Sequence, residues 1–321
     1  MREVARKRLT VFTGTAHPGL GDEVATAVGV KLGPVEFARF SNGEIYVRFT
    51  ESVRGVDAFV IQPSVEPIND SIMELLLMLD ALKRASAKRI TAVMPYYGYS
   101  RQDKKTLARE PISARLVADL LTAAGADRVL SIDLHAGQIQ GFFDFPFDHI
   151  TALPLLASYM AQKNLKDVVV VSPDAGRVKM AKKYADRLHA PMAIMHKRRP
   201  EKNVAEMMHV IGEVEGMTAI LIDDMVDTAG TMVQAAAALK REGARGIFAC
   251  ATHPILSGDA GERIKLSEIE ELVVTNSLPV PQEGKIDKIT VLSIAPLLAD
   301  TITAVFKEES VSEIVGGDNQ P

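Results

Sequence analysis

The fold is decided by residues 219–231, which read Ala-Ile-Leu-Ile-Asp-Asp-Met-Val-Asp-Thr-Ala-Gly-Thr. Their apolar start, 219–222, has the length and the branched side chains of a buried parallel strand. This strand brings Asp223 and Asp224 to its carboxyl end, the edge at which open α/β sheets bind ligands. The polar turn that follows leads into an Ala-rich helix extending to about Arg241. Because the first amides of a helix lack partners and lie at its positive dipole end, the sequence predicts a phosphate-binding turn.

Acidic side chains beside an anion site fit a ligand that carries both a phosphate and hydroxyl groups. Asp223 and Asp224 can accept hydrogen bonds from ribose hydroxyls while the turn of residues 227–231 holds a 5-phosphate. The alternative is an ordinary strand–turn–helix with a capping Asp or Thr. The apolar strand and the adjacent acid pair favour the sugar phosphate.

Composition limits the class of protein. The chain has 321 residues, enough for two domains, and 47% hydrophobic and 24% charged residues, as in soluble globular proteins. A formal net charge of −4 gives no reason to expect nucleic-acid binding. The single cysteine, Cys250, excludes an intrachain disulfide and fits a reducing compartment. Neither a signal peptide nor an apolar run of membrane-spanning length is evident, so we expect a cytoplasmic protein without membrane partners.

Strand-like runs alternate with helical patterns along the chain, which predicts parallel α/β layers. Residues 81–94 resemble residues 238–251, and each segment reads as a helix end, a basic turn and a buried strand. This similarity predicts a tandem duplication in which only the second half kept the phosphate turn, with chance similarity of two βα units as the alternative. We expect domains at 1–150 and 151–296, followed by a C-terminal helix and tail at 297–321.

Two further strands end in residues that could bind a ligand. Strand 168–171 is followed by Asp174, which alone would most often cap a turn. Strand 129–132 is followed by Asp133 and His135, which fall on the same side of an extended segment. An oxygen and an imidazole in this arrangement can bind a metal or a metal-bound phosphate, although a lone buried His is more often structural.

Three polar segments suit a nucleotide or its phosphates. Residues 96–105 place aromatic side chains beside Arg101 and Gln102, which offers faces for stacking and donors for a base or phosphate. Residues 40–44 form a turn that carries an aromatic and an acid, although Asn-Gly is also a common hairpin turn. The cationic residues 196–199 follow a strand-like run and begin a predicted mobile loop that could close over a polyphosphate. For the two basic segments, a solvated surface loop is the alternative.

Taken together, these motifs resemble those of the ribose-phosphate pyrophosphokinase (phosphoribosyl pyrophosphate synthetase) family, class I. The resemblance extends from about Leu9 to Val315. The matching segments are Phe-Ser-Asn-Gly-Glu (40–44), Glu-Ser-Val-Arg-Gly (51–55), Arg-Gln-Asp-Lys-Lys (101–105), Asp-Leu-His with Gln-Ile-Gln-Gly-Phe-Phe-Asp (133–144), Ser-Pro-Asp-Ala-Gly (172–176), His-Lys-Arg-Arg (196–199) and the 223–231 turn.

The resemblance implies an α/β fold of two tandem phosphoribosyltransferase-like, Rossmann-like domains with parallel sheets flanked by helices. It implies transfer of the diphosphoryl group of ATP to the 1-hydroxyl of ribose 5-phosphate, which gives 5-phosphoribosyl 1-diphosphate for nucleotide biosynthesis and AMP. Positioning and charge neutralisation would carry most of the catalysis.

The resemblance also assigns roles to residues. Ribose 5-phosphate would be bound by Asp174, Arg199, Asp223, Asp224, Asp227, Thr228, Ala229, Gly230 and Thr231. ATP would be bound by Phe40, Asn42, Gly43, Glu44, Arg101 and Gln102. Mg²⁺ would be bound near His135 and Asp174, with Asp133 as a further candidate. Lys197 and Arg199 would stabilise the transition state. A regulatory site for activating inorganic phosphate and inhibitory ADP would include Ser52, Arg54, Lys105, Arg109, Ser310 and Ser312.

In this family the ATP site lies between domains, and the loop matching residues 40–44 comes from a neighbouring subunit. The resemblance therefore implies a dimer as the minimum functional unit and a homohexamer as the expected assembly. The chain departs from the family at Arg177, where glycine is commoner, and this departure adds a cation near the substrate site. Residues 106–110 also differ from the usual regulatory loop, which puts the strength of ADP inhibition in doubt.

Two other functions fit part of the sequence. A phosphoribosyltransferase would need only one domain and would leave residues 40–44, residues 101–105 and the duplication unexplained. A non-catalytic regulatory relative should have interrupted catalytic motifs, whereas Lys197, Arg199 and the 223–231 turn are present without insertion.

Overall fold

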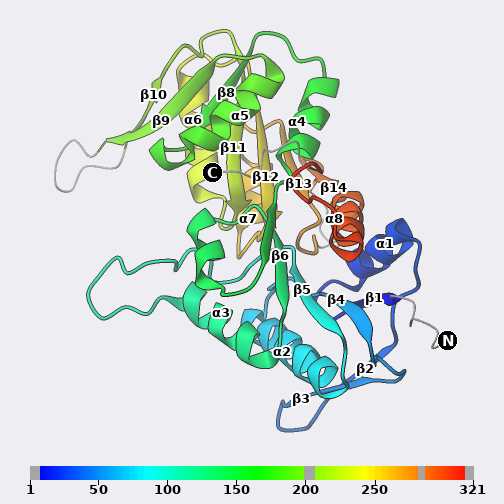
Figure 1. Ribbon diagram of the computed structural model, residues 1–321. Coiled ribbons are helices and arrows are strands. Elements are labelled where there is room, and N and C mark those ends of the chain that lie inside the picture. Colours follow the sequence, from blue (N-terminus) through cyan, green and yellow to red (C-terminus); the bar gives the residue numbers. More distant parts are fainter. Residues whose placement is uncertain (1–7, 199–206, 281–285, 315–321) are drawn as a thin grey trace. The chain divides into compact units, whose positions relative to one another are not determined.

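The computed structural model describes residues 8–198, 207–280 and 286–314 (Figure 1). The chain forms two compact units. Of the described residues, the first unit contains 8–151, 277–279 and 294–314, and the second contains 152–198, 207–276, 280 and 286–293. None of the helices in these ranges has both the length and the apolar composition required to span a membrane.

The first unit is built on a parallel sheet of five strands in the order β1-β4-β5-β6-β7. The strands are β1 (Arg8–Thr13), β4 (Val56–Ile61), β5 (Arg89–Met94), β6 (Arg128–Ile132) and β7 (Phe147–Ile150). They are short apolar runs, as strands covered on both faces require, and all six residues of β4 are buried. An antiparallel hairpin of β2 (Val35–Arg39) and β3 (Ile45–Phe49) precedes β4.

The helices of the first unit bury their apolar faces in its core. These helices are α1 (Pro18–Val28), α2 (Ile68–Arg84), α3 (Ser113–Ala124), the 3₁₀ turn η1 (Gly137–Phe142) and α8 (Ala295–Lys307). Leu75, Leu79 and Leu82 of α2 recur at helical spacing and are fully buried. Each buried leucine contributes about 1.5–3 kcal/mol to stability, so α2 is a main support of the sheet.

The second unit is built on a sheet of seven strands in the order β10-β9-β8-β11-β12-β13-β14. The strands are β8 (Val168–Ser172), β9 (Met192–Arg198), β10 (Met207–Ile211), β11 (Thr218–Val226), β12 (Gly246–Pro254), β13 (Glu271–Thr275) and β14 (Ile289–Leu292). Only the β9–β10 pair is antiparallel among the described pairings of this sheet. The helices are α4 (Leu153–Gln162), α5 (Val178–Leu188), α6 (Gly230–Arg241), α7 (Ala260–Lys265) and the 3₁₀ turn η2 (Ala175–Arg177).

The two units repeat one order of elements. Strands β1-β4-β5-β6-β7 correspond to β8-β11-β12-β13-β14, and the antiparallel pair β2–β3 corresponds to β9–β10. The similar segments 81–94 and 238–251 occupy equivalent positions, at the end of α2 with β5 and at the end of α6 with β12. In each case the helix that follows the last strand of one sheet belongs to the other unit. Helix α4 follows β7 and is part of the second unit, whereas α8 follows β14 and packs on α1 in the first unit.

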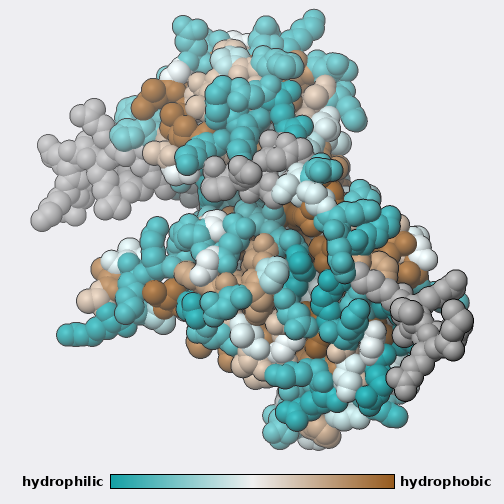
Figure 2. Space-filling view, in the orientation of Figure 1, coloured by the Kyte–Doolittle hydropathy of each residue, from teal (hydrophilic) through white to brown (hydrophobic). Residues whose placement is uncertain are grey.

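Hydrophilic residues cover most of the visible face of the molecule, with apolar residues in smaller patches (Figure 2). One such group of exposed apolar side chains belongs to the start and outer face of α3. Ile112, Leu116 and Leu120 recur every four residues, and Leu116 is 56% exposed. This spacing places them on one side of the helix, away from the buried Val117 and Leu121.

Candidate functional site

The predicted ligand site lies where strand β11 ends. β8 continues through α5 to β9 on one side, while β11 lies on its other side, so β8 and β11 flank a switch in strand order. Such switch points are where open α/β sheets bind ligands. β8 pairs with β11 only as far as Val171 and Leu221, whereas β12 pairs with it through Val226. The end of β11 is therefore without a strand partner on the β8 side.

Strand β11 is longer than the sequence predicted. It extends through both aspartates to Val226, because the nine-residue β12 supplies ladder partners up to Pro254. Asp223 and Asp224 thus lie within the last part of the strand, where their backbone is held by the sheet. Successive residues of a strand normally point to opposite faces of the sheet. The carboxylates of Asp223 and Asp224 nevertheless both lie near the same cationic side chain.

That cation is Arg177, the residue at which the sequence departs from the family. Its Nη2 lies 2.7 Å from Asp224 Oδ2, and its Nε lies 3.6 Å from Asp223 Oδ1. The Asp224 side chain is almost fully buried, at 4% exposure, while those of Arg177 and Asp223 keep 18% and 24%. The structure therefore places the extra cation directly on the acid pair.

Asp223 is an unusual carboxyl group. The pKa of Asp223 is raised to about 8, mainly by removal from water and then by the neighbouring Asp224 charge, while Arg177 opposes both effects. The amide of Asp224 also donates a 2.9 Å hydrogen bond to Asp223 Oδ1. A carboxyl with such a pKa is largely protonated at pH 7, so the two acids and Arg177 together are close to neutral.

Asp174 follows β8 and orders the turn that carries Arg177. Its Oδ1 accepts hydrogen bonds from the amides of Gly176, at 2.8 Å, and Arg177, at 3.1 Å. Asp174 thus caps η2, which is the structural alternative considered for it from sequence. Because it fixes the backbone of Arg177, Asp174 also helps to direct that cation toward the acid pair.

The predicted phosphate turn is formed by Asp227–Gly230. Ala229 has a left-handed backbone, with φ 60° and ψ 0°. Helix α6 ends at Arg241 as predicted, but it begins at Gly230, so that Gly230 and Thr231, predicted to be part of the turn, form its first residues. The N-cap residue, Ala229, makes no side-chain hydrogen bond to this helix, whose first turn contains no acidic residue. Among the described residues, the first amides therefore lack the carboxylate or hydroxyl cap that most helices have, and amides in this position can bind an anion.

The structure corrects the reasoning about Asp133 and His135. Strand β6 ends at Ile132, and Asp133 has a φ of 39°, so the segment is not extended and the same-side argument is wrong. Among the described residues, no group of three or more His, Cys, Asp or Glu side chains is arranged to hold a metal.

The prediction of stacking faces in the 96–105 segment is wrong for Tyr96 and Tyr97, whereas Tyr99 is only half-buried. Tyr96 and Tyr97 are buried, and the Tyr97 hydroxyl donates a 2.9 Å hydrogen bond to the Ala114 carbonyl. Burial raises the pKa of Tyr97. Arg101 and Gln102 are exposed beyond them, with Gln102 Oε1 accepting a 2.6 Å hydrogen bond from Ser113.

Residues 40–44 form the tip of the β2–β3 hairpin. Gly43 has a φ of 92°, which the turn requires, and Asn42 Oδ1 accepts a 3.2 Å hydrogen bond from the amide of Glu44. Phe40 is 56% exposed and meets Tyr46 edge to face. Phe40 therefore has the exposed ring that Tyr96 and Tyr97 lack.

The cationic segment 196–199 begins inside a strand. β9 extends to Arg198 because β10 pairs with it antiparallel, with Met208 opposite Lys197. The prediction that a loop starts at His196 is therefore wrong. Arg199 and the following residues to 206 lie outside the described residues.

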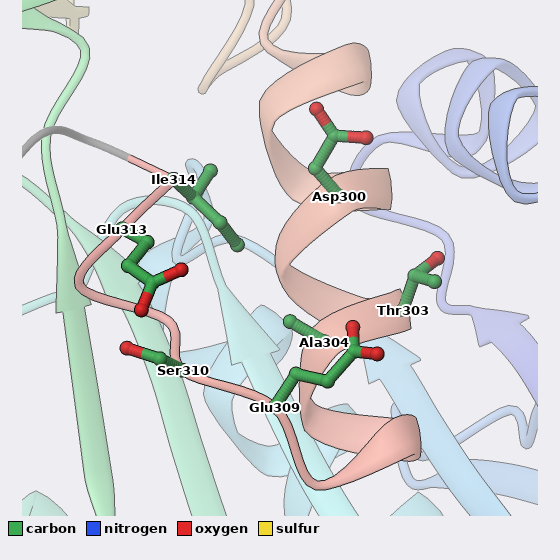
Figure 3. A pocket seen from close by; sticks show the side chains of 7 residues that line it. All are labelled: Asp300, Thr303, Ala304, Glu309, Ser310, Glu313 and Ile314. Atoms are coloured by element: carbon green, nitrogen blue, oxygen red, sulfur yellow. The ribbon is translucent and has the colours of Figure 1, made fainter.

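Of the expected regulatory residues, Ser310 lines a cavity of about 640 Å³ beside α8. Figure 3 shows three carboxylates around it, those of Asp300, Glu309 and Glu313, and the lining contains no cation. Such a cavity repels phosphate. In the divergent 106–110 loop, the Glu110 carboxylate accepts 2.8 Å hydrogen bonds from the amides of Thr106 and Leu107, which lower its pKa.

Arg263 is a residue near this site that the sequence analysis did not single out. It lies on α7 and donates a 3.0 Å hydrogen bond to the carbonyl of Thr228 in the phosphate turn. No motif connects a cation in this short helix to a turn formed much earlier in the chain.

Comparison with known proteins agrees with this architecture. Two family models match: the N-terminal domain of ribose phosphate pyrophosphokinase over residues 9–125, and the phosphoribosyl synthetase-associated domain over residues 197–315. The ribose-phosphate pyrophosphokinase of Clostridium tetani is 55% identical, with 96% of this chain and 98% of that protein covered. The one from Bacillus subtilis is 56% identical, with 95% and 96% covered.

A solved structure shows the same fold over nearly the whole chain. The crystal structure of phosphoribosylpyrophosphate synthetase from Mycobacterium smegmatis superposes with a TM-score of 0.90 at 52% identity, covering 94% of this chain and 100% of that one. The expected fold of two tandem α/β domains is thereby confirmed. Sequence, fold and the arrangement of the β11 site together establish that this chain belongs to the ribose-phosphate pyrophosphokinase family.

Proposed function

We propose that this chain transfers the diphosphoryl group of ATP to the 1-hydroxyl of ribose 5-phosphate, giving 5-phosphoribosyl 1-diphosphate and AMP. The observation that carries this proposal is the acid pair at the β8–β11 switch point next to an uncapped helix. That combination suits a ligand with vicinal hydroxyls at one end and a phosphate at the other. Nearly full-length similarity to relatives of this name supports the same reaction.

Ribose 5-phosphate would bind across the end of β11. Asp223 and Asp224 would accept hydrogen bonds from the ring hydroxyls, and Asp174 would contact the ribose or its metal. The turn of residues 227–231 would hold the phosphate through its amides and hydroxyls. Because Asp223 is largely protonated at pH 7 and Arg177 balances the remaining charge, the acids repel the phosphate far less than two free carboxylates would.

ATP would bind through the hairpin tip and the residues after β5. Phe40 would stack on the adenine, with Asn42, Gly43 and Glu44 beside it, and Arg101 and Gln102 would contact the rest of the nucleotide. In this proposal the hairpin reaches the ATP of a neighbouring subunit. The exposed stripe of Ile112, Leu116 and Leu120 supports self-association, because apolar residues aligned on one helix face are typical of interfaces.

Catalysis would rest on positioning and on neutralisation of charge. The attacking 1-oxygen displaces AMP at the β-phosphorus, and negative charge spreads over the transferred group. Lys197 and Arg199 would stabilise that charge. Mg²⁺ held by His135 and Asp174, with Asp133 as a further candidate, would shield the phosphate oxygens from one another when bound.

We also propose the finer features that the family suggests. The assembly would be a homohexamer in the cytoplasm, where ATP is abundant and the lone buried thiol of Cys250 stays reduced. Inorganic phosphate would activate the enzyme and ADP would inhibit it through Ser52, Arg54, Lys105, Arg109, Ser310 and Ser312. Within this set, Ser310 shares its pocket with the carboxylates of Asp300, Glu309 and Glu313, which disfavour an anion there.

The test is to identify the products. The protein is incubated with ATP, ribose 5-phosphate and Mg²⁺, and the nucleotides are separated by ion-exchange chromatography. AMP formed in equal amount to 5-phosphoribosyl 1-diphosphate supports the proposal. ADP would indicate ordinary kinase chemistry, and absence of turnover would favour a regulatory relative.

A further inference from the structure

Arg263 is held next to the predicted phosphate turn by the packing of α7. Ala260 and Ile264 of this helix are fully buried in the core of the second unit, whereas Arg263 is exposed. The Arg263 Nη1 donates to the Thr228 carbonyl at 3.0 Å. A methyl group built on Gly230 would lie only 3.8 Å from the same nitrogen. The guanidinium thus lies beside the first residue of α6.

The loop that leads to α7 is fastened to the same turn. The amide of Leu256 donates to the Val226 carbonyl at 2.9 Å, and the amide of Ser257 donates to the Asp227 carbonyl at 3.1 Å. These backbone bonds connect the loop before Arg263 to both the end of β11 and the turn. The position of the guanidinium is therefore set by the fold and does not depend on a flexible side chain alone.

The charge of Arg263 is unfavourable where it lies unless an anion is present. The amino end of a helix carries a partial positive charge, and a cation there is destabilising. The first turn of α6 has neither an acidic residue nor a side-chain cap to offset it. In the described part of the chain, the contact that Arg263 makes is with the neutral Thr228 carbonyl, and no carboxylate pairs with it.

The other cation at this edge of the sheet is already paired. Arg177 contacts both carboxylates of the acid pair. Two sources of positive potential, Arg263 and the α6 dipole, therefore lie at the turn, while Arg177 balances Asp223 and Asp224. This arrangement is complementary to a phosphate dianion.

We propose that Arg263 binds the 5-phosphate of ribose 5-phosphate and is a specificity determinant for the phosphorylated sugar. This inference rests on the proposed function of the 227–231 turn, and it adds a residue to that site. The hydrogen bond to Thr228 holds one nitrogen of the guanidinium, which leaves the remaining donors for the phosphate oxygens.

Two substitutions separate charge from hydrogen bonding. Arg263→Gln keeps a donor for the Thr228 carbonyl and removes the positive charge, whereas Arg263→Lys keeps the charge. Ribose 5-phosphate affinity is measured by isothermal titration calorimetry, and kcat and both KM values by steady-state assays at saturating co-substrate. Lys265→Ala is the matched control, because Lys265 is exposed on the same helix and pairs only loosely with Glu262, at 3.7 Å.

We expect Arg263→Gln to weaken ribose 5-phosphate binding by roughly 10- to 100-fold, the range for one charge-assisted contact, with KM for ATP and kcat changed less than about 2-fold. Arg263→Lys should bind within about 5-fold of wild type, since a point charge still attracts phosphate. Lys265→Ala should match wild type. Because Arg263 is exposed, its variants should keep the wild-type melting temperature within about 2 °C.

The inference is overturned if Arg263→Gln binds ribose 5-phosphate as wild type does, or if the Gln and Lys variants lose affinity equally. Either result would mean that Arg263 only stabilises the turn, through its hydrogen bond to Thr228, and does not bind the phosphate. Failure of the proposed function is a different observation, namely that the wild-type protein itself neither binds nor converts ribose 5-phosphate. The two failures are thus distinguished within one set of measurements.

Discussion

Arg177 is the residue whose removal tests the electrostatics of the site most sharply. Arg177→Ala leaves Asp224, whose side chain is 4% exposed, without the 2.7 Å partner seen in the structure. Breaking a fully buried ion pair costs about 3–5 kcal/mol, and since Arg177 itself keeps 18% exposure we expect a cost at or just below the lower end of that range, about 2–3 kcal/mol at pH 9.

The cost should depend on pH with a definite sign. The pKa of Asp223 is raised to about 8, well above that of an unfolded aspartate, so between those two values the folded protein binds a proton that the unfolded chain does not. Stability therefore falls as pH rises toward 8. Arg177 lowers this pKa, and removing it raises the pKa further.

The difference between variant and wild type follows from that shift. Well below pH 8 both proteins carry a protonated Asp223, and the repulsion between the two acids is absent. At higher pH the wild type ionises first, and each pH unit by which the variant's pKa exceeds it adds about 1.4 kcal/mol to the cost. We expect the destabilisation of Arg177→Ala to be larger at pH 9 than at pH 6 by about 1 kcal/mol.

The assay is urea denaturation followed by circular dichroism at pH 6, 7.5 and 9. Lys182→Ala is the control on α5, the helix that directly follows Arg177, since Lys182 and Asp186 form an exposed pair, with 62% and 61% of their side chains accessible. Its cost should stay below about 0.5 kcal/mol at every pH. A cost for Arg177→Ala as small as the control's, or one that does not change with pH, would refute the reasoning.

Four other outcomes are expected. Lys197→Ala should lower kcat by about 10²–10⁴-fold with little change in ribose 5-phosphate affinity, and an effect confined to KM in steady-state assays would contradict its role. Asp223→Asn should weaken ribose 5-phosphate binding by about 10-fold in calorimetry, because an amide has only one acceptor oxygen, whereas a carboxyl group has two. Wild-type affinity in this variant would remove Asp223 from the sugar site. Phe40→Ala should raise KM for ATP by about 5- to 100-fold through lost stacking while Phe40→Tyr does not, and equal effects of the two substitutions would argue against stacking. Substituting both Leu116 and Leu120 by Asp should lower the assembly size in analytical ultracentrifugation, and an unchanged sedimentation coefficient would place the interface elsewhere.

Much of the fold was predictable because local signals agreed with the tertiary structure. The apolar run at 219–222 could only be a buried strand, and the polar turn after it could only begin a helix, so β11, the turn and α6 were predicted together. The repeat between 81–94 and 238–251 likewise predicted two similar units, which the matching strand orders confirm. Each of these features is encoded within a short stretch of the chain, so it can be recognised without knowing which distant residues pack against it.

The errors arose where distant residues decide the structure. His196–Arg198 read as the start of a loop because the segment is charged, but β10 supplies ladder partners that local sequence cannot reveal. Tyr96 and Tyr97 resembled a nucleotide platform, yet both are buried, and Tyr97 contacts Ala114 of α3 and Phe147 of β7, which lie far from it in sequence. Asp133 adopts a left-handed backbone for which no glycine or asparagine gave a signal.

The charge balance of the site was only partly predictable. The resemblance to the family singled out Arg177 as an added cation, but it did not predict the contact of Arg177 with both acids, which connects the turn after β8 to β11. Arg263 gave no signal at all, because its relation to Thr228 exists only after α7 folds back on the turn. Contacts such as these, between a cation on one helix or turn and a residue on a distant strand or turn, can be identified only from the three-dimensional structure.

The central claim is that ribose 5-phosphate binds at the carboxyl end of β11, and a crystal structure with this compound tests it most directly. We predict the phosphate within about 3 Å of the amides of residues 229–231 and the ring hydroxyls on the carboxylates of Asp223 and Asp224, which is ordinary hydrogen-bond distance. Sugar phosphate bound at any other position, with this turn left free, would contradict the account.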